Sequence, residues 1–218
     1  MDYYRVLLVH GFFRSNRDME YIASVLRNSG FRVDNLDLPL TFSDITFSEK
    51  IIRAKLEEIS KDRFSKNSEI ILIGYGMGGY LVRKVIHDMG LKDFFMKMIF
   101  IAAPTKTPKI IKINMGLVRV LSKIFKPLKI FLEDEIENLP EPQEELGIIR
   151  STEPDSHLLK KYFSEYNDGA LNSDEVVFNR EFEIIDIPFG RKEVHKRPGT
   201  VEYIMDFIET GKFKHDKI

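Results

Sequence analysis

Residues 71–80 read ILIGYGMGGY, and this segment constrains the fold more than any other part of the chain. An apolar run with the length of a buried strand meets a turn of four glycines, and an amphipathic helix follows from about Gly78 to Asp88. Glycines at such a turn adopt backbone conformations closed to other residues and let a helix approach its strand closely. The segment therefore predicts a strand, a sharp turn and a helix that packs back on the same sheet.

The succession of apolar run and helical segment repeats along the chain. Three of the runs, VLLV, IILI and MIFIA, are nearly continuous in apolar residues, as in strands buried on both faces of a sheet. We expect parallel strands at about 4–9, 32–37, 69–74, 97–102, 146–150 and 182–187. We expect helices at about 17–29, 46–60, 78–89 and 199–210. This alternation predicts a single α/β domain over residues 1–218, built on a doubly wound, mainly parallel sheet.

Composition limits the classes of function. The chain has 33 basic and 34 acidic residues, a formal net charge of −1 and 43% hydrophobic residues. This is a globular composition without the overall basic footprint of a nucleic-acid-binding protein. Because there is no cysteine, disulfides and thiolate metal sites are excluded. No metal-ligand spacing links His87, His157 and His215, and no motif requires a cofactor.

No segment predicts export or membrane insertion. The chain enters an apolar strand within a few residues of Met1, without a basic and then long apolar leader. No stretch approaches the ~18 consecutive apolar residues of a membrane span. We therefore expect a cytoplasmic protein.

Residues from about 105 to 143 depart from the repeat and are expected to form a short cap. The first part is basic and the second acidic, with no acid before Glu133. Residues 116–131, GLVRVLSKIFKPLKIF, predict an amphipathic helix that Pro127 kinks or ends. Its basic face would carry Arg119, Lys123 and Lys126, with Leu117, Val120, Leu121, Ile124 and Leu128 largely opposite. A solvated lid is the plainer interpretation, and contact with a membrane or an acidic partner is the alternative.

The ordered motifs of the chain resemble the small lipase/esterase branch of the α/β-hydrolase superfamily over nearly the whole length. YYRVLLVHGFFRSNRDM (3–19) resembles the first core strand with its His-Gly oxyanion loop, and YIASVLRNSGFRVDNLDLP (21–39) the helix and strand that follow. MKMIFIAAPTKTP (96–108) resembles the strand after the Gly-rich turn and its helix. NLPEPQEELGIIRS (138–151) and YNDGALNSDEV (166–176) resemble the strand and loop that carry the catalytic acid. Residues 183–213 resemble the last strand, the histidine loop and the closing helix.

The resemblance implies that residues 74–78 form the nucleophile elbow, a strained strand-to-helix turn with the pattern G-x-S-x-G. This chain has Gly76 where the serine is expected. Glycine has no side chain to form an acyl-enzyme, so the usual covalent mechanism cannot start there. The two oxyanion-hole donors would be the backbone N–H groups of Phe12 and Met77, which survive side-chain substitution. His10 is expected to hold its loop by hydrogen bonds.

The resemblance also assigns the acid and the histidine. The acid falls on Asp168, and the histidine position, three residues after Pro188, falls on Arg191. A reshaped loop would instead bring His195 into the site. Asp168 would then pair with His195. If Arg191 occupies the histidine position, Asp168 instead forms part of a turn or an ion pair with Arg191. The acids Asp174 and Asp155 are weaker alternatives.

Other interpretations of the turn and its surroundings are open. A Gly-rich turn before a helix can bind phosphate, but this one matches neither the Walker nor the dinucleotide pattern. A carboxylate or another anion could dock there, because Gly76 leaves room beside the N–H groups. Ser15 is a conceivable stand-in nucleophile, although it suits the N-cap of the next helix better.

Two functional hypotheses follow. The first is a lipase/esterase-like protein that has lost serine-based hydrolysis and binds a small-molecule or lipid-like ligand, or a partner, in the old pocket. The alternative is an active ester or lipid hydrolase with a non-standard site, or a hydrolase whose serine was removed by mutation. The position of Arg191 relative to Asp168 and His195 discriminates between them.

Overall fold

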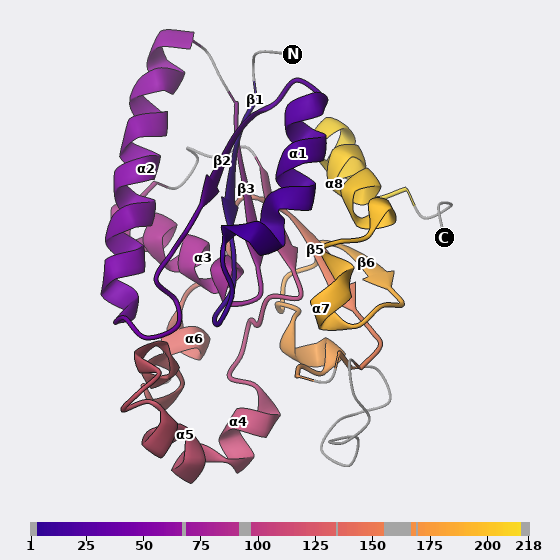
Figure 1. Ribbon diagram of the computed structural model, residues 1–218. Helices are drawn as coiled ribbons and strands as arrows, with labels where there is room; N and C mark the ends of the chain where they lie inside the picture. The colour runs from indigo at the N-terminus through magenta and orange to yellow at the C-terminus, as the bar shows by residue number, and fades with distance from the viewer. Residues whose placement is uncertain are drawn as a thin grey trace.

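The structure is a computed structural model that describes residues 4–66, 69–91, 97–133, 135–154, 167–168 and 170–214, with only the backbone for 62–66 and 135. Its centre is one six-stranded sheet in the order β2-β1-β3-β4-β5-β6, and every neighbouring pair is parallel (Figure 1). The strands are β1 (Tyr4–Val9), β2 (Arg32–Leu36), β3 (Glu69–Tyr75), β4 (Lys97–Ile101), β5 (Glu145–Ser151) and β6 (Glu183–Ile187). The doubly wound parallel sheet expected from the sequence is therefore confirmed, with each strand within one or two residues of its predicted bounds.

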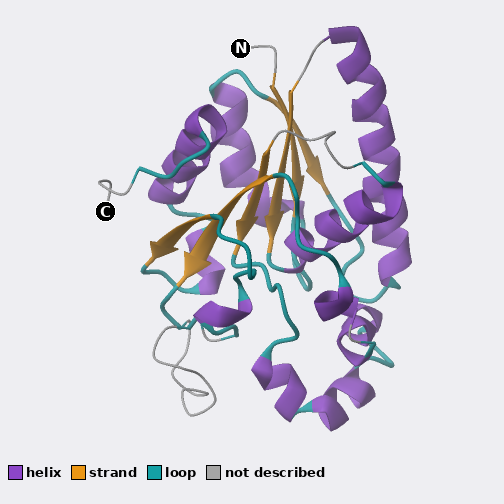
Figure 2. Ribbon diagram, turned by 180° about the vertical axis from the view of Figure 1, so that it is seen from behind, coloured by secondary structure: helices purple, strands orange, loops and turns teal. Residues whose placement is uncertain are grey.

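Alternating strand residues divide the core into two layers. The side chains of Leu7, Leu72 and Phe100 join one cluster, whereas those of Leu8, Ile73 and Ile101 join the other. Helices α2 (Ile45–Lys66) and α3 (Met77–Met89) cover the first face. Helices α1 (Glu20–Asn28) and α8 (Pro198–Thr210) cover the second. Figures 1 and 2 show the sheet between these two helix pairs. Near-continuous apolar strands are needed because both faces are buried.

Short helices gather beyond the carboxyl ends of the strands, where Figure 1 shows α4 and α5 at the bottom of the molecule. They are α4 (Lys109–Ile113), α5 (Met115–Leu121), α6 (Glu135–Asn138) and α7 (Arg191–Val194). Three 3₁₀ helices complete the described elements: η1 (Asn16–Met19), η2 (Lys126–Leu132) and η4 (Ser173–Glu175). None of the helices in the described ranges is long and apolar enough to cross a bilayer.

The cap differs from its predicted form. The expected helix over 116–131 ends at Leu121, and Pro127 lies in the first turn of η2 instead of ending a helix. Val118 and Ser122 form the buried side of α5 and the turn after it, which leaves Leu117, Val120 and Ile124 between 58% and 62% exposed. These apolar side chains were expected on a buried face largely opposite the basic ones. Of the five residues assigned to that face, only Leu128 of η2 is buried. The prediction was wrong because the helix breaks before its second half can follow the same face.

A buried arginine attaches the cap to the domain. Arg83 on α3 is 5% exposed and donates hydrogen bonds to the carbonyl oxygens of Ile136 (3.2 Å), Leu139 and Pro140 (3.0 Å). Its guanidinium lies 5.0 Å from the ring centroid of Phe178. Burial lowers the pKa of Arg83 to about 10, which leaves it charged at neutral pH.

Candidate functional site

A cavity of about 490 Å³ lies at the carboxyl ends of β1 and β3, where ligands bind in open α/β sheets. The end of β1 and the Gly-rich turn form its floor, and residues of α4 and η2 form a wall. Most of its lining side chains are apolar, and two are cationic. The lining comprises Gly11, Phe12, Phe13, Arg14, Tyr75, Gly76, Met77, Pro104, Pro108, Ile110, Ile111, Leu128, Phe131, Ala170, Leu171 and Arg191.

The Gly-rich turn has the sharp geometry of an elbow. Gly76 leaves β3 with φ +55° and ψ −129° and is the N-cap of α3. Its N–H donates to the carbonyl oxygen of Ile101 at 2.9 Å, which fixes the turn to β4. A Cβ at Gly74 would lie 2.5 Å from the nitrogen of Gly79, and one at Gly78 would collide with the end of β1. The turn therefore requires glycines for close packing as well as for its positive φ.

Arg191 occupies the space in front of Gly76. An ideal Cβ placed at Gly76 would lie 2.9 Å from Nη2 and 3.9 Å from Cζ of Arg191. The guanidinium comes from the first turn of α7, directly after the loop that follows β6. Any side chain at position 76 would therefore point at this cation, so the two residues fit each other.

Asp168 lies behind Arg191. The Nη1 atom of Arg191 donates to Oδ2 of Asp168 at 3.2 Å, so the ion pair that was one expected arrangement is present. Oδ1 of Asp168 accepts backbone hydrogen bonds from Ala170 (2.8 Å) and Leu171 (2.6 Å). Asp168 is 2% exposed, so the turn holds a buried carboxylate against one end of the guanidinium.

Tyr75 positions the segment that carries Arg191. Its hydroxyl donates to the carbonyl oxygen of Arg191 at 2.9 Å. Its ring packs against that of His195, with the centroids 4.2 Å apart. The sequence gives no signal of this long-range contact, because Tyr75 is a single residue between two glycines of a turn.

His195 lies outside the cavity lining. It is fully buried, and the carboxylate within 4.0 Å of its ring nitrogens, among the residues with described placement, is that of Asp18, at 3.9 Å. The structure thus brings Arg191, and not His195, to Asp168. Burial, with a smaller contribution from Lys196, lowers the pKa of His195 to about 4, against the opposing effect of Asp18. The imidazole is therefore neutral at neutral pH.

The loop after β1 is held as expected. His10 is fully buried, with Nδ1 2.9 Å from the carbonyl oxygen of Gly11, and Nε2 accepts the N–H of Leu38 at 2.9 Å. Burial lowers the pKa of His10, so the neutral form holds the loop. The predicted structural role of His10 is confirmed. Phe12 and Met77 both line the cavity, which brings together the two residues whose N–H groups were assigned to the oxyanion hole.

The remaining candidates lie elsewhere. Ser15 is the N-cap of η1, as expected, and its N–H donates to Asp18 at 3.2 Å. Asp174 is exposed on η4, and His87 is exposed at the end of α3. Asp155, His157 and His215 fall outside the described residues. Within the described ranges no group of histidine and carboxylate side chains could hold a metal ion.

The structure adds Arg14 and the apolar wall to the site. Arg14 lines the cavity and pairs with Asp18 at 3.4 Å. Leu128 and Phe131 of η2 and Ile110 and Ile111 of α4 face the same space. Helical spacing in the cap can indicate that it has an apolar face. It cannot indicate which cap residues line the cavity, because the helix breaks at Ser122.

Comparison with known proteins agrees with this architecture. The model of the family described as "Putative serine esterase (DUF676)" matches residues 5–110, just under half of the chain. The matched part contains β1, the His-Gly loop and the Gly-rich turn. No curated protein sequence matches the chain significantly.

Solved structures share the fold over nearly the whole chain at low sequence identity. The mature lipase BlEst2 of Bacillus licheniformis has 15% identity and a TM-score of 0.68, over 95% of this chain and 91% of that one. Tomato methylketone synthase I has 14% identity and a TM-score of 0.62, over 97% and 100%. Phospholipase PlaB of Legionella pneumophila has 10% identity and a TM-score of 0.69, over 97% of this chain and 60% of that one. The chain therefore has the α/β-hydrolase fold, as its motifs predict.

Proposed function

We propose that this α/β-hydrolase-fold chain no longer performs serine-based ester hydrolysis and binds a ligand in the cavity beside Gly76. One observation carries the proposal. The guanidinium of Arg191 stands where a serine side chain at position 76 would project, with Nη2 2.9 Å from the Cβ position. A cation therefore fills the space in which an acyl-enzyme would form.

The chemistry of Arg191 supports this function. Serine hydrolysis needs a base that takes the hydroxyl proton and returns it to the leaving group. A guanidinium stays protonated at any physiological pH and offers only donors, so it cannot act as that base. With Asp168 at 3.2 Å, it forms an ion pair in place of a His–Asp link. The pair can orient a charge but cannot move a proton.

The fit between the two positions supports natural loss over removal of a serine by mutation. Removal in the laboratory would change position 76 alone and leave a histidine opposite it. Here the residue opposite is Arg191. Its Nη2 atom lies 2.9 Å from the Cβ position of Gly76, which is closer than a real Cβ would allow. Each residue is suited to the other, which is expected of two substitutions retained together.

Hydrolysis of p-nitrophenyl butyrate and octanoate tests the proposal. We expect the unmodified chain and Gly76→Ser to turn over at the buffer rate, because neither has a base at position 191. We expect Gly76→Ser/Arg191→His to hydrolyse both esters, since it places a serine, a histidine and Asp168 together. Gly76→Ala/Arg191→His is the matched control without a hydroxyl and should be inactive.

Two outcomes would favour the active hydrolase instead. Turnover by the unmodified chain that disappears in His195→Gln would contradict the loss of hydrolysis and assign the base to His195. Turnover by Gly76→Ser alone would mean that a base is already in place, so that the chain lacks only its nucleophile.

A further inference from the structure

We infer that the cavity binds a molecule with a carboxylate head and an unbranched apolar chain, an inference that rests on the proposed function of ligand binding. The head would contact Arg191 beside Gly76. The chain would extend along the wall formed by α4 and η2. The evidence for each part is separate.

Arg191 has the geometry of a carboxylate receptor. Nη1 is committed to Asp168, whereas Nη2 lies directly in front of Gly76, where both residues line the cavity. The contact with Asp168 is the one ion pair of Arg191 within the described ranges. The side chain is 18% exposed, so it is largely desolvated but reachable from the cavity. Guanidinium groups bind carboxylates in paired, charge-assisted hydrogen bonds, which suit this position.

The backbone around Arg191 adds donors of the right sign. Met77 is the first residue of α3, a 13-residue helix, so its N–H has no carbonyl partner within the helix. The Cβ position of Gly11 lies 3.4 Å from that nitrogen, which places the loop of Phe12 directly against the helix start. An anion bound to Arg191 beside Gly76 would therefore meet the positive end of α3 as well.

The rest of the cavity suits an apolar chain. Phe12, Leu128 and Phe131 line it together with Ile110 and Ile111, and the volume of about 490 Å³ lies within the usual range for ligand pockets. Among the described lining residues none is acidic, and Arg14 is a second cation. The cavity therefore favours a negative head over a neutral or positive one, and each buried methylene adds affinity.

Titration calorimetry with dodecanoate and dodecanol tests this inference. We expect dodecanoate to bind at least tenfold more tightly than dodecanol, because a hydrogen bond to a charged group is worth about 10- to 150-fold. Across octanoate, decanoate and dodecanoate, affinity should rise roughly 15-fold for each two methylenes. Arg191→Met should lower dodecanoate affinity at least tenfold and leave dodecanol affinity unchanged.

Arg150→Met is the matched control. Arg150 also pairs with an aspartate, Asp186 at 2.5 Å, but it does not line the cavity. The Arg150→Met variant should bind dodecanoate as tightly as the unmodified chain. Arg191→Lys should retain part of the affinity if charge alone contributes. Equal affinity for acid and alcohol, or no binding of either, would overturn the inference. Those results would not affect the proposal that hydrolysis has been lost. Ester turnover by the unmodified chain would contradict that proposal, whether or not dodecanoate binds.

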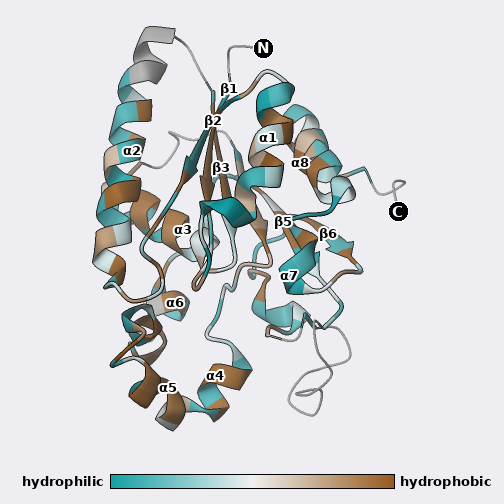
Figure 3. Cartoon of the chain, viewed as in Figure 1, coloured by the Kyte–Doolittle hydropathy of each residue, from teal (hydrophilic) through white to brown (hydrophobic). Residues whose placement is uncertain are grey.

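The outer surface of the cap carries a second, independent proposal. We propose that it docks on an anionic lipid bilayer. Figure 3 shows hydrophobic residues on α4 and α5 at the end of the molecule away from the sheet. Ile113, Leu117, Val120 and Ile124 are between 51% and 62% exposed. Such an exposed apolar cluster on a monomer marks an interaction surface.

Charge selects a bilayer as the occupant. Arg119, Lys123 and Lys126 are exposed among the apolar residues, and no ion pair holds any of them in the part of the chain that the structure describes. In the acidic run beyond residue 132, Glu137 pairs with Lys112 at 2.6 Å. The run forms no ion pair with the other three cations among the described residues. Apolar side chains interleaved with free cations are the features that bind an anionic interface.

Cosedimentation with phosphatidylcholine vesicles, with and without 30% phosphatidylserine as the chosen composition, tests this docking. We expect binding only with phosphatidylserine, weakening with added salt. Lys123→Glu should lower affinity by more than fivefold, since each basic residue contributes about that factor. Leu117→Gln/Ile124→Gln should abolish binding, whereas Lys61→Glu on α2 should not. Equal binding to both vesicles, or a dimer in solution that the same cap substitutions dissociate, would overturn the proposal.

Discussion

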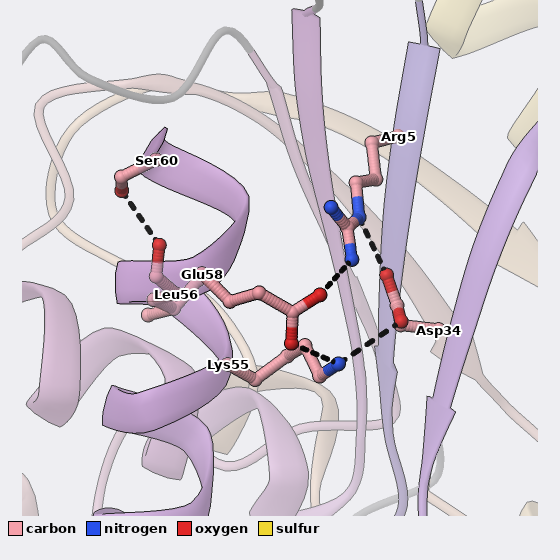
Figure 4. A network of polar contacts seen from close by, with 6 residues as sticks. All are labelled: Arg5, Asp34, Lys55, Leu56, Glu58 and Ser60. Atoms are coloured by element: carbon pink, nitrogen blue, oxygen red, sulfur yellow. Dashed lines mark hydrogen bonds and ion pairs between the residues drawn. The ribbon is translucent and has the colours of Figure 1, made fainter. Parts of the chain in front are cut away.

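Arg5 is buried and Arg191 is half-buried; both pair with aspartates, yet their surroundings differ. Arg5 on β1 donates from Nε to Asp34 on β2 and from Nη2 to Glu58 on α2, each at 2.7 Å (Figure 4). Lys55 contacts the same two carboxylates, at 3.4 Å and 2.6 Å. Arg191 has one carboxylate, at 3.2 Å, and faces a cavity.

The contrast separates a structural arginine from the proposed carboxylate receptor. In the network of Arg5, two cations meet two carboxylates, so the protein itself satisfies every charge. At Arg191 the protein fixes one end of the guanidinium and leaves the other toward Gly76. A buried guanidinium such as that of Arg5 must find all its partners within the fold, whereas a partly paired cation beside a cavity can find them in a ligand.

The largest expected effect comes from removing each arginine in turn. Arg5→Met should lower the free energy of unfolding by about 3 kcal/mol, because it leaves two carboxylates beside the sheet with Lys55 alone. Arg191→Met should cost about 1 kcal/mol, since Asp168 retains two backbone N–H donors. Urea denaturation measures both. Equal losses would contradict the distinction between the two arginines.

The surroundings of Arg5 and of Arg191 should also respond differently to acid. The folded pKa of His195, about 4, lies below its ordinary 6.5, so the unfolded state takes up the proton first. Stability is therefore full above pH 6.5 and falls as the pH drops toward 4. The loss attributable to His195 is about 2 kcal/mol at pH 5. His195→Phe, which retains a ring against Tyr75, should reduce this loss.

Hydrogen exchange at pH 7 and pH 5 checks where the acid effect arises. Amides of α7 and the start of α8 should lose protection in the unmodified chain and retain it in His195→Phe. Those of β1 and β2 should change little, because the pKa of Glu58, about 2, and the raised pKa values of Arg5 and Lys55 lie outside this window. Loss of protection first at β1 would contradict the assignment. His10 remains in both proteins, and its lowered pKa leaves a residual pH dependence in the variant.

A smaller effect is expected from filling the space in front of Arg191. Gly76→Ala should cost about 1–2 kcal/mol, because φ is +55° and the new Cβ meets Nη2 at 2.9 Å. Gly116→Ala on α5 is the control, since a Cβ there has no neighbour within 4 Å. It should stabilise the chain slightly, as alanine does in a helix. Thermal denaturation of the two variants distinguishes strain at the elbow from a general effect of glycine replacement.

The sequence predicted the sheet well because its strands are buried on both faces. Apolar runs such as residues 69–75 have no other stable place in a chain of this size, and the glycines after β3 fix the next helix. The cap was predicted less well. The spacing of Leu117, Val120 and Arg119 favoured burial of the two apolar residues, but contacts with the domain set the side that α5 buries, which is that of Val118.

The site was only partly predictable for a similar reason. The resemblance to α/β-hydrolases implied Asp168 and Arg191 as neighbours, in agreement with the rule that loops after parallel strands meet at one edge of the sheet. Nothing in the spacing could show that Nη2 of Arg191 reaches Gly76, or that Tyr75 holds the carbonyl of Arg191. Those contacts depend on the path of the loop between β6 and α7. The same path places His195 behind Tyr75 and not at Asp168.

The smallest expected effect lies at the solvent side of the Arg5 network. The hydrogen bonds of Glu58 with Lys55 and Arg5 lower its pKa to about 2, yet its side chain is 51% exposed. The stabilisation is therefore present above pH 4.5 and lost as the pH falls through about 2, and solvent screening keeps it small. Glu58→Gln should cost less than about 1 kcal/mol at low salt and almost nothing in 1 M NaCl. A loss as large as that of Arg5→Met would mean that Glu58, and not Asp34, is the main partner of Arg5, and the network would then depend on its most exposed member.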